Sequence, residues 1–112
     1  MSQGSWTIQK YVTDTGLCPF ERWFETLDPQ TQVRIDVRLD RLSLGNFGDC
    51  KSLGKGIYEL RLFFGPGYRV YYGLVGQQIV LLLCGGSKKG QRKDISTARK
   101  FWAAYLDERE GE

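Results

Sequence analysis

Two arginines, Arg61 and Arg69, carry the chemistry that this sequence offers most clearly. They have the same parity on two stretches, residues 57–64 and 68–74, in which large apolar side chains alternate with others as they do in strands. The Gly-Pro-Gly sequence at 65–67 predicts a tight connection between the two stretches. An antiparallel hairpin would hold both guanidinium groups on one face, opposite the buried tyrosine and leucine side chains.

Glu59, Tyr71 and Lys88 could complete this constellation. Glu59 and Tyr71 share the parity of the two arginines, so we expect these side chains together on one open surface. The basic loop after the apolar run at 79–84 can overhang the same face with four side chains: Lys88, Lys89, Arg92 and Lys93. The chain contains no histidine, so phosphodiester cleavage would need arginine or lysine to stabilise the phosphorane and an acid, phenol or ammonium to move protons. The pattern therefore favours phosphate chemistry.

Basic residues gather in this half of the chain. Residues 51–93 hold eight basic residues and one acidic residue, a net charge of +7, and the remainder sums to −4 within a total of +3. Such polarity is typical of a basic surface that faces a polyanion or an acidic partner. We assign substrate or RNA contacts to seven residues: Lys51, Lys55, Glu59, Tyr71, Lys89, Arg92 and Lys93.

Each feature also has a purely structural explanation. Glu59 and Arg61 could form a cross-strand ion pair, Tyr71 could be a packing residue, and a basic loop is usually solvated. The glycine-rich stretches lack the spacing of a phosphate-binding loop or a dinucleotide fingerprint, so we expect no nucleotide cofactor. The functional interpretation depends on the convergence of the features.

Length and composition limit the architecture. Residues 1–112 suffice for one domain with a modest core. The longest apolar run is too short to span a bilayer and the N-terminus carries no basic start, so we expect a cytoplasmic protein without a membrane partner. The three cysteines form no Cys-x-x-Cys pair and no histidine accompanies them, so we expect buried, reduced thiols, no metal site and no cofactor.

A strand and two helices precede the hairpin. Residues 6–12 alternate as a first strand, and residues 19–27 place their apolar side chains at helical spacing. Asp28 suits the N-cap of a second helix over 29–44, and Gly45 suits its left-handed stop. The two helices therefore form a helical hairpin.

The second helix has two apolar flanks and an arginine stripe. Its periodicity places Ile35, Leu39 and Leu42 on one flank, Val33, Val37 and Leu44 on the other, and Arg34, Arg38 and Arg41 between them. Burying both flanks requires two neighbours, which could be the sheet on one side and the first helix or a partner protein on the other.

The remaining segments complete an α+β fold. We expect loops at 45–56 and 87–93, a central strand at 79–84, and a last helix that Asp94 caps. The predicted architecture is a small antiparallel sheet, with the first strand at the edge of a three-stranded meander, a helical hairpin on one face and a C-terminal helix.

Several segments of the chain occur in the same order in a known superfamily. These are Leu39-Asp40-Arg41-Leu42, Gly45-Asn46-Phe47-Gly48-Asp49, Lys51-Ser52-Leu53-Gly54, Tyr58-Glu59-Leu60-Arg61, Gly65-Pro66-Gly67-Tyr68-Arg69-Val70-Tyr71 and Leu83-Cys84-Gly85-Gly86-Ser87-Lys88. From Phe20 to Ala98 the chain resembles the phage-derived, HigB-like killer proteins of the RelE/ParE superfamily. The resemblance implies a RelE-like fold and a toxin of a type II toxin-antitoxin system. Such toxins are usually ribosome-dependent messenger-RNA endonucleases, which a cognate antitoxin neutralises.

The resemblance also implies roles for individual residues. By position, Arg69 resembles the arginine that contacts the scissile phosphate, Arg61 resembles a strand lysine of the general-base region, and Lys88 resembles the basic residue after the last strand. We assign these three residues as catalytic. Asp94 stands where the RelE prototype has a tyrosine, which leaves the proton-transfer groups open.

Two alternatives keep the same fold. One is a ParE-like inhibitor of DNA gyrase that cleaves no RNA, and the other is a non-catalytic module that binds RNA or the ribosome. The three basic residues favour the nuclease, because a toxin that only binds protein needs no phosphate ligands on a sheet face. Since Arg69 and Lys88 are expected to point away from the core, replacing either by alanine should leave stability nearly unchanged.

Overall fold

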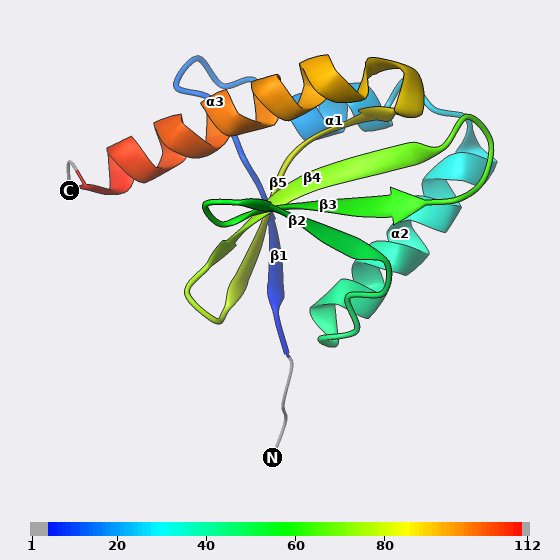
Figure 1. The fold of residues 1–112 in the computed structure, drawn as a ribbon, viewed down its shortest axis with the longest axis horizontal. Helices are drawn as coiled ribbons and strands as arrows, with labels where there is room; N and C mark the ends of the chain where they lie inside the picture. The colour runs from blue at the N-terminus through cyan, green and yellow to red at the C-terminus, as the bar shows by residue number, and fades with distance from the viewer. Residues whose placement is uncertain (1–4, 111–112) are drawn as a thin grey trace.

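Five strands form one mixed sheet in the computed structural model, which describes residues 5–110 (Figure 1). The elements are β1 (Thr7–Lys10), α1 (Pro19–Phe24), α2 (Pro29–Ser43), β2 (Cys50–Gly54), β3 (Ile57–Leu62), β4 (Tyr68–Val75), β5 (Ile79–Ser87), a 3-10 turn η1 (Lys88–Gly90) and α3 (Gln91–Glu110). The spatial order is β1-β5-β4-β3-β2. The predicted α+β class and the meander of β3, β4 and β5 are confirmed.

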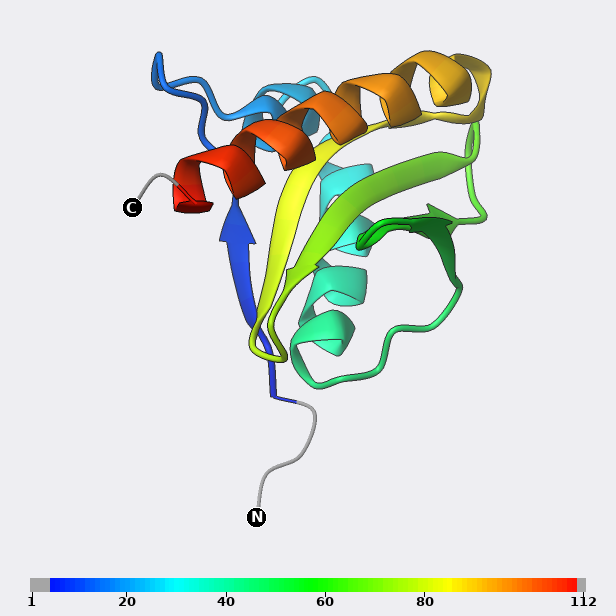
Figure 2. The same ribbon diagram turned by 60° about the vertical axis from the view of Figure 1, so that its left-hand side comes forward.

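The first strand lies at an edge, as predicted, but it does not run antiparallel to its neighbour. β1 pairs in parallel with β5, from Thr7 opposite Ile79 to Lys10 opposite Leu82, and Figure 2 shows the two strands side by side. No short turn joins β1 to β5 in the sequence, so no hairpin dictates an antiparallel pairing. The prediction of a purely antiparallel sheet is therefore wrong.

The opposite edge is a strand that we predicted to be loop. Within residues 45–56, the segment Cys50–Gly54 forms β2, antiparallel to β3, with an irregular register between Ser52 and Gly54. A tight turn follows, in which Lys55 has a φ of 56°. The strand is short and mostly polar, so its pairing with β3 defines it, and its own side-chain pattern does not reveal it.

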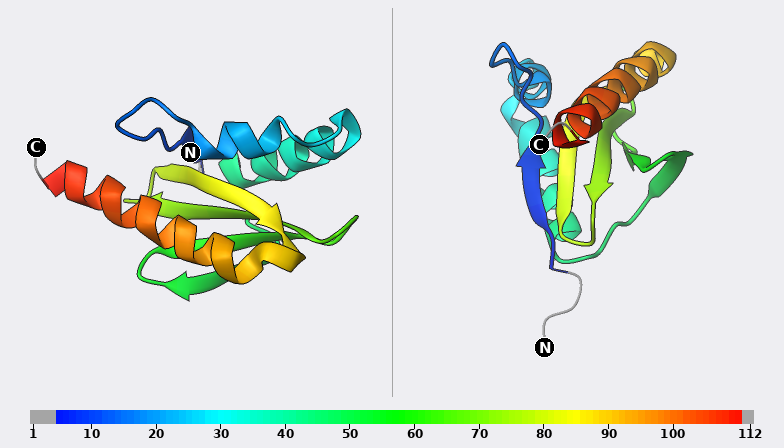
Figure 3. Two further views of the ribbon diagram at one scale, coloured as in Figure 1. Left: turned by 90° about the horizontal axis from the view of Figure 1, so that it is seen from above. Right: turned by 90° about the vertical axis from the view of Figure 1, so that its left-hand side faces the viewer.

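Both faces of the sheet are covered by helices (Figure 3). One core lies between the sheet and the hairpin of α1 and α2: Phe20, Ile35, Leu39, Leu42, Leu60, Leu62, Val70, Tyr72, Val80 and Leu82. The second core lies between the sheet and α3: Tyr11, Ile57, Tyr71, Val75, Leu81, Leu83, Cys84, Ala98 and Trp102. The unbroken apolarity of β5 follows from this arrangement, since its side chains enter both cores.

The caps of α2 agree with the sequence prediction. The Asp28 side chain accepts hydrogen bonds from the backbone N–H and the hydroxyl of Thr31, and the hydrogen bonds lower the pKa of its carboxyl. Gly45 takes the left-handed conformation, with a φ of 84°. The helix α1 is shorter than predicted, because regular helix ends at Phe24 and single turns continue the chain to α2.

The helix α3 begins earlier than predicted. β5 continues through Ser87, and η1 leads directly into α3, so Gln91, Arg92 and Lys93 are helical and not part of a loop. Asp94 therefore lies inside the first turn and is not the N-cap, although a carboxylate there still complements the helix dipole. Within residues 5–110 no helix is long and apolar enough to cross a membrane.

Trp102 fixes α3 to the sheet. Its Nε1 donates a hydrogen bond to the carbonyl of Lys55 over 2.9 Å, and its ring lies directly over Gly73 of β4. Tyr105 stacks on the ring at a centroid distance of 5.8 Å. A side chain at position 73 would occupy the space of the indole, so glycine there permits the close approach of α3.

We predict that Gly73→Ala lowers the free energy of unfolding by about 1–3 kcal/mol, the usual effect of overpacking a core. Urea unfolding measures this change. Gly90→Ala is the matched control, because an added Cβ at position 90 would lie 3.3 Å from the end of the movable Asp94 side chain. Equal stability of the two variants would contradict the proposed contact.

Candidate functional site

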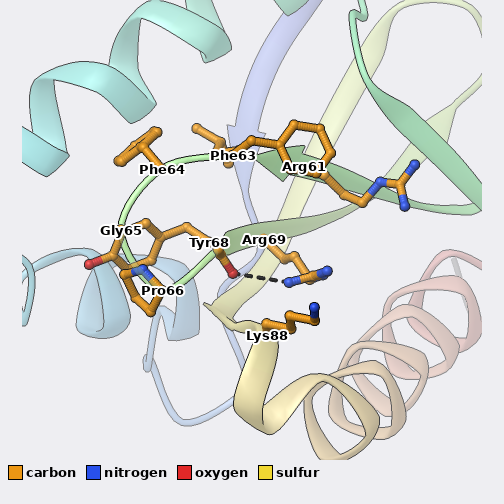
Figure 4. Close-up of a pocket in the computed structure, with 10 residues that line it drawn as sticks. Arg61, Phe63, Phe64, Gly65, Pro66, Tyr68, Arg69 and Lys88 are labelled. Carbon is orange, nitrogen blue, oxygen red and sulfur yellow. Dashed lines mark hydrogen bonds between the residues drawn. The ribbon is translucent and has the colours of Figure 1, made fainter.

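A hollow of ≈ 320 Å³ opens at the hairpin that joins β3 to β4 (Figure 4). Its lining consists of Arg61, Leu62, Phe63, Phe64, Gly65, Pro66, Gly67, Tyr68, Arg69 and Lys88. Gly65 and Gly67 have φ values of 55° and 79°, in the left-handed region that favours glycine. We name this feature the basic hollow, because its cations are Arg61, Arg69 and Lys88.

The predicted pairing of the two arginines is confirmed. Arg61 of β3 lies directly opposite Arg69 of β4 in the register, so both side chains leave the same face. They then diverge: Arg61 Nη2 lies 3.2 Å from Asp49 Oδ1, whereas Arg69 Nη1 donates to the carbonyl of Gly67 over 3.0 Å. Each arginine therefore has its own anchor within one hollow.

Lys88 lies on the same wall of the basic hollow as Arg69 (Figure 4). A Cβ built on Gly67 would lie 3.5 Å from Lys88 Cβ and 3.6 Å from Arg69 Nη1, so both side chains pass this glycine. Lys88 is exposed in η1, and Arg69 is only 8% exposed. At this wall the hollow thus combines an exposed cation, Lys88, with a buried one, Arg69.

Glu59 and Tyr71 lie behind Arg69, and the prediction of an open surface for them is wrong. Both are 0% exposed, because the first turn of α3 covers this part of the sheet. Glu59 Oε2 lies 3.6 Å from Arg69 Nε and accepts a hydrogen bond from Gln91 Nε2 over 2.8 Å. Their placement makes Glu59 and Tyr71 supports for Arg69 rather than surface contacts.

Burial governs the protonation of Tyr71. Desolvation, followed by the neighbouring charge of Glu59, raises the pKa of its phenol well above the ordinary value. The phenol therefore stays protonated at neutral pH. Within the described residues, three atoms of this cluster are buried without a hydrogen-bond partner: Tyr71 Oη, Glu59 Oε1 and Arg69 Nε. Buried polar atoms in folded proteins usually have such a partner.

Asp94 packs against the same corner of the sheet. Its carboxylate occupies the space that a side chain on Gly86 would need, and Gly86 is the register partner of Arg69 on β5. Burial raises the pKa of Asp94, and the nearby charge of Lys93 opposes this shift. Gly86, the second glycine of the Cys-Gly-Gly segment, thus leaves the space that α3 needs for its packing.

The other predicted contacts are divided among three places. Lys51 lies on β2 opposite Glu59, exposed at the edge of the same sheet face. Lys55 lies in the turn before β3, beside Trp102, and the structure does not bring it to the basic hollow. Lys89, Arg92 and Lys93 line a separate hollow of ≈ 510 Å³ on the outer side of α3, together with Gly90, Ser96, Thr97 and Lys100.

Sequence reasoning missed two supporting residues: Asp49, which pairs with Arg61, and Gln91, which donates a hydrogen bond to Glu59 behind Arg69. Both residues fall in segments that we predicted to be loops, where parity gives no information about direction. The burial of Glu59 could have been predicted from the apolar face of the last helix. That face must pack on the sheet, on the side opposite to the helical hairpin.

Cysteines and acids form no metal site in the part of the chain that the structure describes, where no three potential ligands group together. Cys18, Cys50 and Cys84 are free thiols. The predicted burial is correct for Cys84 and wrong for Cys18 and Cys50, which are half-buried. Burial raises the pKa of the Cys84 thiol to about 12, so this group remains protonated and inert.

A family model described as "Phage derived protein Gp49-like (DUF891)" matches residues 22–103, which include the whole basic hollow. The chain belongs to the Gp49-like family. Its family is of the RelE/HigB-like toxin type, and such a family implies an antitoxin as partner. A Haemophilus influenzae protein with the name "Uncharacterized protein" is 46% identical to this Gp49-like chain over 94 residues, which cover 83% of the chain and 91% of that relative.

We predict that Glu59→Leu lowers the free energy of unfolding by about 3 kcal/mol, because it leaves the Arg69 charge buried without its carboxylate. Adding Arg69→Met should recover most of this loss, since an apolar pair needs no counter-charge. Urea unfolding of both single variants and the double variant measures the coupling. Glu25→Leu, which changes an exposed glutamate after α1, is the control. A double variant no more stable than Glu59→Leu would contradict the pairing.

Proposed function

We propose that this Gp49-like protein is a toxin that cleaves messenger RNA at the ribosome, without a metal ion, and that a cognate antitoxin keeps it inactive. The observation that carries the proposal is the convergence of Arg69 and Lys88 at Gly67, with Arg61 on the same hollow. The proposal is also supported by the family of the chain, because the Gp49-like family is of the toxin type.

In the proposed reaction, the scissile phosphate binds in the basic hollow. The ribose 2′-hydroxyl loses its proton to solvent water and its oxygen forms a bond to phosphorus. The bond from phosphorus to the 5′-oxygen breaks and that oxygen takes up a proton, which yields a 2′,3′-cyclic phosphate and a 5′-hydroxyl. Arg69 Nη1 is held by Gly67 and its Nε faces Glu59, so its orientation is set before RNA arrives. Such preorganised charge stabilises the phosphorane without reorganisation.

Lys88 and Arg61 have distinct parts in this proposal. Lys88 is exposed, so its ammonium can reach the leaving 5′-oxygen and donate a proton to it. Arg61 is held by Asp49 at the other side of the hollow and would bind a neighbouring phosphate. Tyr71 stays protonated and buried, so its role is to support Glu59 and Arg69.

The second basic hollow extends the proposed RNA surface. This hollow is lined by Lys89, Arg92 and Lys93, which lie within five residues of Lys88 in the chain. Their charges lie on the outer side of α3. Contacts to phosphates of the ribosome there would raise affinity without selecting a sequence.

We predict that Lys88→Ala reduces cleavage by ~10²-fold or more and leaves the free energy of unfolding unchanged, because this side chain is exposed. The measurement is primer extension on messenger RNA in a translating extract with the purified protein. Arg109→Ala, at the far end of α3, is the control and should cleave normally.

Arg69 needs a more conservative variant. Arg69→Ala was expected to leave stability nearly unchanged because its side chain would point away from the core, but Arg69 is buried against Glu59. We predict that Arg69→Lys stays folded, since it keeps the charge near Glu59, and that it loses ~10²-fold in cleavage because it lacks the planar fork of donors. Cleavage at the wild-type rate by folded Arg69→Lys would count against the assignment.

Two other results would redirect the proposal. Gyrase inhibition without messenger-RNA cleavage by the wild-type protein would favour the ParE-like function. Ribosome binding without cleavage would favour the non-catalytic module.

A further inference from the structure

The exposed flank of α2 forms a groove with the end of β3. The groove has a volume of ≈ 290 Å³ and is lined by Val33, Arg34, Val37, Arg38, Arg41, Leu62, Phe63 and Phe64. Three of its apolar side chains are unusually accessible: Val33 is 61% exposed, Val37 is 43% exposed and Phe63 is 76% exposed. We name it the α2 groove.

This flank is the one that the sequence predicted to need a second neighbour. The opposite flank, formed by Ile35, Leu39 and Leu42, is buried against the sheet. No element within residues 5–110 covers Val33 or Val37. A contiguous apolar strip that stays uncovered on a folded chain marks an interaction surface.

Three arginines surround this apolar floor. The guanidinium of Arg34 lies 4.8 Å from the centroid of the Phe64 ring, and Arg38 Nη1 donates to the carbonyl of Arg61 over 3.3 Å. In the described part of the chain, none of Arg34, Arg38 and Arg41 has a carboxylate oxygen within 4.0 Å. Their positive charge is therefore not neutralised by the protein itself.

The placement of charge along α2 is unfavourable for an isolated helix. Arg34 and Arg38 are four residues apart, a spacing at which like charges destabilise a helix by roughly 0.2–0.5 kcal/mol. The acids Asp36 and Asp40 lie on the side of the groove that faces Lys10 and α1, where they border another hollow. The α2 groove thus combines an apolar floor with a wholly basic rim.

We infer that the α2 groove binds an acidic amphipathic helix of a partner protein, which is the antitoxin if the proposed function holds. Leucine-like side chains of that helix would cover Val33, Val37 and Phe63, and its carboxylates would pair with Arg34 and Arg41. The basic rim selects an acidic partner, and the exposed apolar floor selects a protein helix over RNA, because phosphates make no use of apolar area.

The position of the groove connects binding to the basic hollow. Leu62, Phe63 and Phe64 line both features, on the two sides of one strand end. A helix seated on Phe63 would therefore stand at the rim of the basic hollow and obstruct the approach of a polyanion, without displacing Arg69 or Lys88.

A synthetic peptide tests this inference on the purified full chain. The probe is a fluorescently labelled helix of about three turns, with leucines at i, i+4 and i+7 and glutamates beside them. A peptide of the same composition in scrambled order is the control. We expect saturable binding by fluorescence anisotropy, with a dissociation constant in the micromolar range, for the ordered peptide alone.

Paired variants locate the binding site. Val37→Asp should weaken binding at least ~10-fold, which corresponds to about 1.4 kcal/mol. Val12→Asp makes the same change at a side chain of similar exposure, 50% against 43%, outside the groove, and should leave binding unchanged. Arg41→Glu should weaken binding, whereas Arg109→Glu should not.

Four results would overturn the inference. They are no saturable binding, equal binding of the scrambled peptide, an equal loss in Val12→Asp, and self-association of the chain in analytical ultracentrifugation that Val37→Asp abolishes. The last result would assign the groove to a second copy. Because no RNA is present, a chain that binds the peptide but cleaves no messenger RNA would remove the nuclease proposal and keep this one.

Discussion

The buried carboxylate of Glu59 is the constraint on which the rest of this structure depends. A charge without solvent exposure must be compensated, and here three elements meet to do so: β3 carries it, β4 supplies Arg69, and α3 supplies Gln91. The same contacts set the direction of Arg69 toward the basic hollow. One polar cluster therefore joins β3, β4 and α3 and orients the arginine of the site.

Local periodicity predicted the hairpin and α2 correctly. The pairing of Arg61 with Arg69 followed from parity and a Gly-Pro-Gly turn, and Asp28 and Gly45 marked the ends of α2 by their capping chemistry. These are interactions between near neighbours in the chain, which a sequence encodes directly.

Features that depend on distant partners were not predictable in this way. Parity placed Glu59 and Tyr71 on a common face, but it gave no information on whether a helix covers that face. The segment 50–54 becomes a strand only because β3 offers a free edge, and β1 runs parallel only because of the path taken by the chain between the two strands. Asp49 and Gln91 were missed for the same reason, because each contacts a residue that is distant in the sequence, Arg61 and Glu59 respectively.

The pairing of β1 has a consequence for how the molecule forms. Thr7 meets Ile79 far along the chain, whereas the basic hollow is built from the continuous stretch that runs from β3 to the start of α3. Closing a long loop costs entropy before any contact compensates for it, so distant pairings form late. We therefore expect β1 to pair late, so that the hollow can assemble while this edge of the sheet is still unpaired.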